Sequence, residues 1–296
     1  MHILITGGTG FIGEPLANSL LSEGHRVTIL SRTPRRDGGL CRYVLSLSAL
    51  DEDEPLDAII NLAGASLADK RWSRSYKQKI VDSRLETTRG VIDLIKRSEQ
   101  KPAVLLNASA IGFYGAQADE KLDETAPVGA GFAAELCRDW EAVAGEAEAE
   151  GVRVCLMRLG VVLDKGQGAF VEMERPFNFG MANWMGDGHQ YLSWIHRKDA
   201  VAAIRQLLYD NTASGIYNLT APEPVTSREF CEAMKRQRRT FITMPVPGFA
   251  LRLAVGEMAN ELLINGQRVI PARLEEGSFE FSCPDIDSAL SAIYSD

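Results

Sequence analysis

A chain of 296 residues, of which 45% are apolar and 24% are charged, has the composition of an ordinary globular protein and can bury a large core. Its net charge of -8 argues against nucleic acid or an anionic membrane as a partner. Five scattered cysteines without a Cys-x-x-Cys pair predict a reduced cytoplasmic protein, and four histidines outside any ligand-spaced cluster predict no bound metal.

The first predicted element is a short apolar strand, Ile3–Ile5, which leads directly into a glycine-rich turn and then a helix. Strand, tight turn and helix in this order form the first unit of a dinucleotide-binding fold. The glycines permit the turn and let a cofactor approach the backbone, while the helix N-terminus attracts a pyrophosphate. The residues of this turn that we expect to contact the cofactor are Gly7, Gly10, Phe11, Ile12 and Gly13.

The second predicted strand, His25–Leu30, indicates which dinucleotide the turn receives. An NAD site has an acidic residue near the end of this strand to hold the ribose 2′-hydroxyl. Here Ser31 and Arg32 follow the strand instead, and a guanidinium group pairs well with phosphate oxygens. We therefore predict NADP as the cofactor, with Ser31 and Arg32 among its ligands. Arg35 and Arg36 fit either a phosphate contact or a solvated basic turn.

Strands and helices continue to alternate along the next part of the chain. Strands are predicted at Asp57–Asn61, Ala103–Ala108 and Arg153–Leu159, and helices at 76–98 and 132–150. This alternation predicts a Rossmann-type α/β fold, in which a doubly wound parallel sheet is covered on both faces. The two long helices could also pair two copies of the chain into a homodimer, although ordinary surface helices have the same pattern.

After residue 160 the regular alternation stops, which predicts a second structural unit. We expect residues 1–160 to form the dinucleotide-binding domain, and residues 187–220 to return to it. Residues 161–186 and 221–296 then form a smaller, mostly helical substrate domain. The segment 164–190, rich in glycine and aromatic residues, is expected to form loops and short helices over the cleft.

Ligands of a parallel sheet bind beyond the C-terminal ends of its strands. Leu62, Ala63 and Gly64 directly follow one predicted strand and are therefore expected to contact the cofactor. Ser109 follows the next strand, and Tyr114 lies close enough in sequence that we expect it to project into the same cleft. One cleft is thus predicted to collect the polar groups that act on a bound substrate.

Motifs along the whole chain resemble those of extended short-chain dehydrogenases/reductases. They are Thr6-Gly-Gly-Thr-Gly-Phe-Ile-Gly13, Asn61-Leu-Ala-Gly64, Ser109-x-x-x-x-Tyr114-Gly115 and Trp194-Ile-His-Arg-Lys-Asp199. A further set is similar to the NADP-binding "epimerase family protein" subgroup of atypical members. It comprises Asp69-Lys-Arg-Trp72, Ser83-Arg84, Leu136-Cys-Arg-Asp-Trp-Glu141, Gly186-Asp-Gly-His-Gln190 and Gly266-Gln-Arg-Val-Ile-Pro271. The resemblance implies a nucleotide-sugar-epimerase-like fold, Arg84 as a further cofactor contact, and a short C-terminal domain of uncharacterised type from Pro245.

The chain departs from this family at the residues that perform the chemistry. Short-chain dehydrogenases normally use a Tyr-x-x-x-Lys pair, in which the tyrosine is the acid/base and the lysine lowers its pKa. No tyrosine of this chain has a lysine four positions later. If Glu141 is the glutamate that typically follows the pair in extended members, Ala133 takes the place of the tyrosine and Cys137 that of the lysine. Neither side chain can do that work.

Ser109 and Tyr114 are the remaining candidates for catalysis. Ser109 occupies the place of the serine that polarises the substrate oxygen in the family, and the Tyr114 phenol is the best remaining proton donor. A tyrosine is a poor base at neutral pH unless a cation lowers its pKa, and Lys70 or Arg71 are candidates for that cation. As an alternative, Tyr114 forms an aromatic wall of the substrate pocket.

These observations leave two hypotheses about function. The first is an NADP-dependent oxidoreductase or epimerase that acts on a small polar substrate of the sugar or carbonyl class. The second is an NADP(H)-binding redox sensor or partner-binding protein with little or no turnover. The missing tyrosine and lysine favour the second hypothesis, whereas the glycine-rich aromatic segment over the cleft favours the first, because a pure sensor has less need of a pocket.

Overall fold

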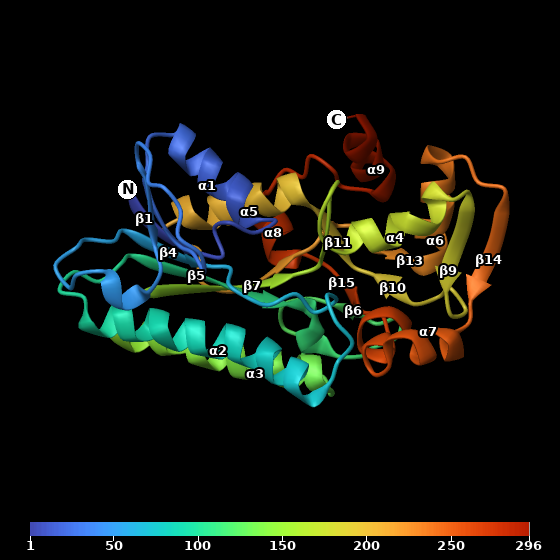
Figure 1. Ribbon diagram of the computed structural model, residues 1–296, viewed down its shortest axis with the longest axis horizontal. Coiled ribbons are helices and arrows are strands. Elements are labelled where there is room, and N and C mark those ends of the chain that lie inside the picture. The colour runs from blue at the N-terminus through green and yellow to red at the C-terminus, as the bar shows by residue number, and fades with distance from the viewer. Residues whose placement is uncertain (296) are drawn as a thin grey trace.

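The computed structural model describes residues 1–295 as a parallel sheet with helices on both faces and a smaller body at one end (Figure 1). The sheet has seven strands in the order β12-β7-β5-β4-β1-β2-β3, and all neighbouring strands are parallel. Its strands are β1 (His2–Thr6), β2 (Arg26–Leu30), β3 (Cys41–Val44), β4 (Ala58–Asn61), β5 (Val104–Ala110), β7 (Arg153–Leu159) and β12 (Gly215–Leu219). The prediction of a Rossmann-type, doubly wound α/β fold is therefore confirmed.

Helices lie on both faces of the sheet because each presents an apolar stripe to it. One face carries α1 (Gly13–Ser22), α5 (Arg197–Tyr209) and the short α8 (Ala272–Glu276), and the other carries α2 (Arg74–Arg97) and α3 (Phe132–Gly145) (Figure 1). Helix α5 begins at Arg197 because the His196 side chain accepts a hydrogen bond from the Lys198 amide. None of the helices within residues 1–295 is both long and apolar enough to traverse a lipid bilayer.

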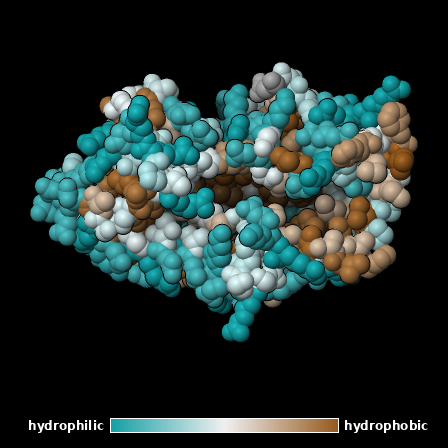
Figure 2. Space-filling model, viewed as in Figure 1, coloured by the Kyte–Doolittle hydropathy of each residue, from teal (hydrophilic) through white to brown (hydrophobic). Residues whose placement is uncertain are grey.

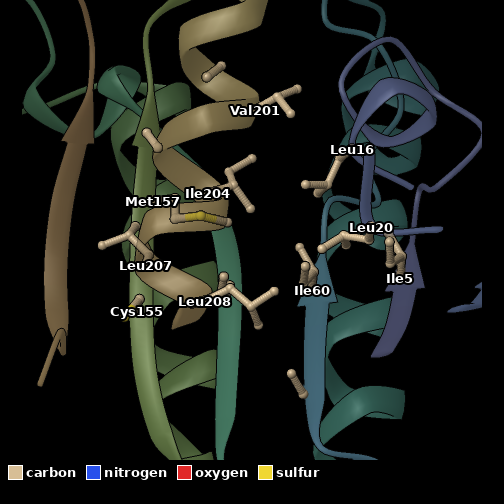
Figure 3. Packing of buried hydrophobic residues seen from close by; sticks show 14 of the residues in the cluster. Ile5, Leu16, Leu20, Ile60, Cys155, Met157, Val201, Ile204, Leu207 and Leu208 are labelled. Carbon is tan, nitrogen blue, oxygen red and sulfur yellow. The ribbon is translucent and has the colours of Figure 1, made fainter. Parts of the chain in front are cut away.

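The main hydrophobic core lies between the sheet and the pair α1 and α5. Leu16 and Leu20 of α1 meet Ile5 and Ile60 of the sheet, and Ile204 of α5 packs in the same layer (Figure 3). All five side chains are fully buried. This packing holds the start of α1 close to the ends of β1 and β4, which is the place where the cofactor contacts are predicted.

The smaller body has its own core and short strands as well as helices. Its elements are α4 (Ala169–Asn178), β9 (Met181–Met185), β10 (Tyr191–Leu192), β13 (Val225–Thr226), α6 (Ser227–Gln237), β14 (Ile242–Val246), α7 (Gly248–Val255) and α9 (Ile286–Ser295). Two further strand pairs lie between it and the sheet: β8 (Val161–Leu163) with β11 (Trp194–His196), and β6 (Lys121–Leu122) with β15 (Arg268–Val269). The helical C-terminal region is confirmed, whereas the domain boundaries stay a prediction.

The segment 164–190 is more regular than we expected. It forms a helix, α4, and a strand, β9, which pairs in parallel with β14 more than fifty residues further along the chain. A strand whose partner is so distant has no local signal other than its own composition, and the glycines on either side of β9 indicated loops.

We predict that the α1 packing sets the stability of the fold. Leu16→Ala removes a fully buried side chain and should lower the free energy of unfolding by about 2–5 kcal/mol, because a cavity remains in the core. Leu45→Ala is the matched control, since Leu45 is 59% exposed. Urea unfolding followed by circular dichroism measures both. Equal losses in the two variants would contradict this account of the core.

Candidate functional site

The glycine turn between β1 and α1 is packed so closely that side chains would not fit. Gly7 has a φ of +69°, and a Cβ atom there would lie 2.7 Å from the Leu62 carbonyl oxygen. A Cβ atom on Gly13 would collide with the Gly7 carbonyl oxygen. The Gly10 amide closes the turn by donating to the same Gly7 oxygen over 2.9 Å. Helix α1 then begins without a side-chain cap, because its N-cap residue is Ile12. The Glu14 and Leu16 amides donate to the carbonyls of Gly10 and Ile12, and Pro15 has no N–H, so the amide of Gly13 is the one in this first turn that is left for an anion.

A buried polar network holds the strand ends beside this turn. Thr6 donates to Asn61, and Asn61 donates to Asn107 over 2.6 Å and to Thr88 over 2.8 Å. The Thr6 hydroxyl also accepts a hydrogen bond from the Ala63 amide. The ends of β1, β4 and β5 and the middle of α2 are thereby tied together. The predicted cofactor contacts after β4 are positioned by this network.

Arg84 reaches from α2 to the segment that follows β4. Its Cζ atom is 3.1 Å from where a Cβ of Gly64 would be, so only glycine leaves room for the guanidinium group. The group donates to the carbonyls of Ala65 and Ile80 and lies 5.2 Å from the Trp140 ring centroid. Burial lowers the pKa of Arg84. Within residues 1–295 this arginine forms no ion pair, and it is therefore a cation held at the cleft without a protein counter-charge.

The arginines that follow β2 differ in their positions in the structure, which the sequence did not indicate. Ser31 is buried, and its hydroxyl donates to the Thr33 carbonyl, so this side chain shapes the turn. Arg32 is exposed to solvent. Arg35 lies 5.9 Å from the ring centroid of Tyr43 and lines a small cavity of about 50 Å³ next to the glycine turn. Arg35 is thus the arginine that lies beside the turn, while Arg32 projects into solvent.

Ser109 is turned away from the cleft and into a buried ion pair. Its hydroxyl donates to Glu141 Oε1 over 2.6 Å. Arg158 binds both oxygens of the same carboxylate, from Nε and Nη2 over 2.8 Å each. Ser109 and Arg158 are only 2% and 1% exposed. The three residues come from β5, α3 and β7, so this pair joins the C-terminal ends of two sheet strands to α3.

The expectation that Tyr114 projects into the cleft is wrong, because its side chain is completely buried. Its hydroxyl donates to Asn218 over 2.7 Å and accepts from Arg158 Nη1 over 3.0 Å. Burial raises the pKa of Tyr114 even though the Arg158 charge acts in the opposite direction. The cation beside this phenol is therefore Arg158 rather than Lys70 or Arg71. Arg71 lies against Gly256 instead.

Helix α3 carries no acid or base at the two family positions. Cys137 is 4% exposed, and burial raises the pKa of its thiol to about 11. At the start of α3, however, the Ala133 amide donates over 3.3 Å to Glu261, which comes from the C-terminal body. Gly131, with a φ of +109°, makes room for this carboxylate, because a Cβ there would lie 2.5 Å from its Oε1. No spacing motif in the sequence could have indicated Glu261, since it is 128 residues away.

A second residue that the sequence did not reveal stands over the glycine turn. Arg197, the first residue of α5, pairs with Asp164 over 2.5 Å, and its Cζ lies 4.9 Å from the ring centroid of Phe11. Gly168 approaches the same ring closely. The loop after β8 therefore closes against the side chain of a predicted cofactor contact. The sequence signal for Arg197 was its place in the Trp194-Ile-His-Arg-Lys-Asp199 motif, which gave no indication of its contact with Phe11.

The described part of the chain also contains an open groove away from the glycine turn. The groove, of about 400 Å³, lies between the starts of α2 and α3 and is lined by Trp72, Phe132 and the ion pair of Lys77 with Glu257. No group of three or more His, Cys, Asp or Glu side chains within residues 1–295 is arranged to hold a metal ion. The polar chemistry of the cleft is thus carried by the residues described above.

Known proteins resemble this chain over its full length. Residues 3–220 match the NAD dependent epimerase/dehydratase family, and residues 246–293 match a domain of unknown function, DUF1731. An epimerase family protein of Mycobacterium leprae is 39% identical over 292 residues, which cover 98% of this chain and 94% of that protein. Bacillus subtilis YfhF is 38% identical over 302 residues, which cover 100% of this chain and 99% of that protein.

The solved structures include one of high similarity. The crystal structure of the human epimerase family protein SDR39U1 (isoform 2) with NADPH has a TM-score of 0.89 to this chain and 31% sequence identity, and the match covers 100% of both chains. The fold of this chain, over its full length, is therefore also found in a protein crystallised with NADPH.

We predict that the buried ion pair is needed for stability. Arg158→Met leaves the Glu141 carboxylate buried without its partner and should cost about 3–5 kcal/mol. Arg138→Ala is the control, because Arg138 and Asp139 form an exposed pair worth less than about 1 kcal/mol. Urea unfolding at neutral pH measures both losses. A loss in Arg158→Met no larger than that in the control would refute the structural role of the pair.

Proposed function

Because the chain belongs to the NAD dependent epimerase/dehydratase family, as its motifs predicted, we propose that it is an NADP(H)-dependent oxidoreductase or epimerase acting on a small polar substrate. The observation that carries the proposal is the glycine turn of residues 7–13, in which Gly7 and Gly13 leave no room for a Cβ atom and after which α1 starts without a side-chain cap. When bound, the nicotinamide of such a cofactor accepts or donates a hydride.

The residues around the turn fit the parts of a dinucleotide. The start of α1, with Phe11 and Ile12, would hold the pyrophosphate, and the backbone of residues 62–64 would border the rest of the cofactor. Arg84 supports this placement, because a cation that lacks a protein counter-charge is stabilised by an anionic or strongly polar ligand. The NADPH in the crystal structure of the human relative supports the same choice of cofactor.

The 2′-phosphate of NADP would be bound at the end of β2. Arg35 lines the cavity beside the glycine turn, and the exposed Arg32 directly follows the strand. Two guanidinium groups can form bidentate bonds to one phosphate. The buried Ser31 shapes the turn that carries them both.

We predict that Arg35→Ala and Arg32→Ala each weaken the binding of NADPH more than that of NADH. The loss of a charge-assisted hydrogen bond costs roughly 1.5–3 kcal/mol, or between about tenfold and hundredfold in Kd. Arg26→Ala is the control, because Arg26 lies at the other end of β2 and is bound to Glu54. Fluorescence titration gives each Kd. Equal losses for NADPH and NADH would overturn the assignment.

Proton transfer requires a group other than the ones that the family uses. The hydroxyl groups of Ser109 and Tyr114 are both engaged in buried hydrogen bonds, so a catalytic role for them stays a prediction. We propose that Glu261 exchanges the proton with the substrate oxygen. Its carboxylate lies at the start of α3, bound to the amide of Ala133, which would stand at the family's tyrosine position if Glu141 is the family's glutamate. A carboxyl group can act as acid or base.

We predict that a panel of small sugars and carbonyl compounds contains a substrate that changes the absorbance of added NADPH or NADP⁺. Glu261→Gln should then reduce kcat by about 10²-fold or more, because general acid–base catalysis is typically worth 10²–10⁴-fold. The Kd for NADPH should stay unchanged. Glu275→Gln is the control, because Glu275 is an exposed carboxylate of α8 on the face of the main sheet. Unchanged kcat in Glu261→Gln would remove Glu261 from the mechanism but not the cofactor assignment.

A second candidate function is an NADP(H)-dependent sensor without turnover. It is favoured by Ala133 and the buried Cys137 at the two family positions, and by the fully engaged hydroxyl of Tyr114. The two functions differ in one measurement. A sensor binds NADPH with normal affinity and shows no hydride transfer to any member of the panel, whereas an enzyme shows a substrate-dependent rate.

A further inference from the structure

Charge is unevenly distributed in the C-terminal part of the chain. The segment 233–256 contains the cations Lys235, Arg236, Arg238, Arg239 and Arg252 and not one carboxylate, although the whole chain has a net charge of -8. The expectation against an anionic membrane rested on that net charge. A charge acts only over about 8 Å at physiological ionic strength, so a local excess of cations decides what binds there.

The same segment and the strand that pairs with it contain many exposed apolar side chains. We define the apolar tip as the exposed apolar side chains of β14, of α7, of the start of β9 and of the residues directly before the two strands. They are Phe241 (76% exposed), Ile242 (53%), Met244 (53%), Phe249 (72%), Leu253 (79%), Phe179 (75%) and Met181 (39%). Phe241 and Ile242 lie beside Gly180 and Met181, so the apolar side chains of the two strands form one group, and α7 follows β14 directly in the chain. Isolated exposed apolar residues are normal, but a group of this size indicates an interaction site.

Within each element of the apolar tip, neighbouring apolar side chains lie on one face. Phe249 and Leu253 are four residues apart on α7 and therefore share one face of the helix. Ile242 and Met244 likewise share one face of β14, which pairs with β9 on its inner side. β14 and α7 lie at the end of the molecule opposite the N-terminus (Figure 1), and apolar residues gather on the surface there (Figure 2).

The cations nearest to the apolar side chains have no carboxylate partner within residues 1–295. Arg239 lies 5.5 Å from the ring centroid of Phe241, and Arg252 donates only to the neutral amide of Asn260. The other cations of the segment, by contrast, are neutralised by carboxylates of α4, α6 and α9. These ion pairs are Lys235 with Glu232, Arg236 with Asp287 and Arg238 with Glu174.

We propose that the apolar tip docks on the surface of an anionic lipid bilayer. Phe241, Phe249 and Leu253 enter the boundary between headgroups and acyl chains, while Arg239 and Arg252 bind the lipid phosphates. Exposed apolar side chains flanked by unpaired arginines match both layers of a membrane interface, and this complementarity favours a membrane over a second copy of the acidic chain. The proposal is independent of the proposed enzyme activity.

Vesicle sedimentation of the full chain tests the proposal. Vesicles made of equal parts phosphatidylcholine and phosphatidylglycerol should bind the protein, vesicles of phosphatidylcholine alone should bind it poorly, and added salt should release it. Phe249→Ser with Leu253→Ser should lower the bound fraction about tenfold, and so should Arg239→Glu with Arg252→Glu. Circular dichroism and NADPH titration check that these variants are folded.

Two matched variants serve as controls. Leu45→Ser changes an exposed apolar residue next to β3, and Arg138→Glu changes an exposed arginine of α3, so both should bind vesicles as the unaltered chain does. Equal binding to neutral and anionic vesicles would overturn the proposal. It would also be overturned if no vesicle binds while light scattering detects a dimer that the tip variants abolish, because the occupant would then be a second copy.

Discussion

The ion pair between Glu141 and Arg158 is the interaction that fixes the positions of Ser109 and Tyr114. Because both charges are buried, each carboxylate oxygen and each guanidinium nitrogen needs a hydrogen-bond partner, since an unpaired group would carry the full cost of desolvation. The hydroxyls of Ser109 and Tyr114 satisfy this requirement. Both hydroxyls are thereby engaged in buried hydrogen bonds, and the catalytic role that the sequence suggested for them stays a prediction.

The main sheet and the C-terminal body contribute different residues to the candidate site. The sheet and α1 form a cradle of bare backbone that suits a dinucleotide, and Arg84 adds a cation beside it. The C-terminal body supplies Glu261 to the start of α3 and carries the apolar tip on its outer side. A domain of otherwise unassigned role could in this way both complete the cleft and place it at a membrane surface.

Sequence and structure agreed wherever a function depends on neighbouring residues. The glycine turn was predicted correctly because Gly7 and Gly13 act within one strand–turn–helix unit. The choice among the arginines after β2 was less certain, since which of them faces the cavity depends on where β3 places Tyr43. Tyr114 was misplaced because its burial depends on Asn218, more than a hundred residues away.

The sequence by itself determined the parallel α/β fold, the cofactor turn and the absence of the usual tyrosine and lysine. These properties follow from local periodicity and from spacings within a single motif. Only the tertiary structure decided that Ser109 faces Glu141 and that Glu261 lies beside Ala133. It alone gathered the apolar tip on one surface. Burial and partner choice depend on contacts between distant segments, and no local pattern encodes them.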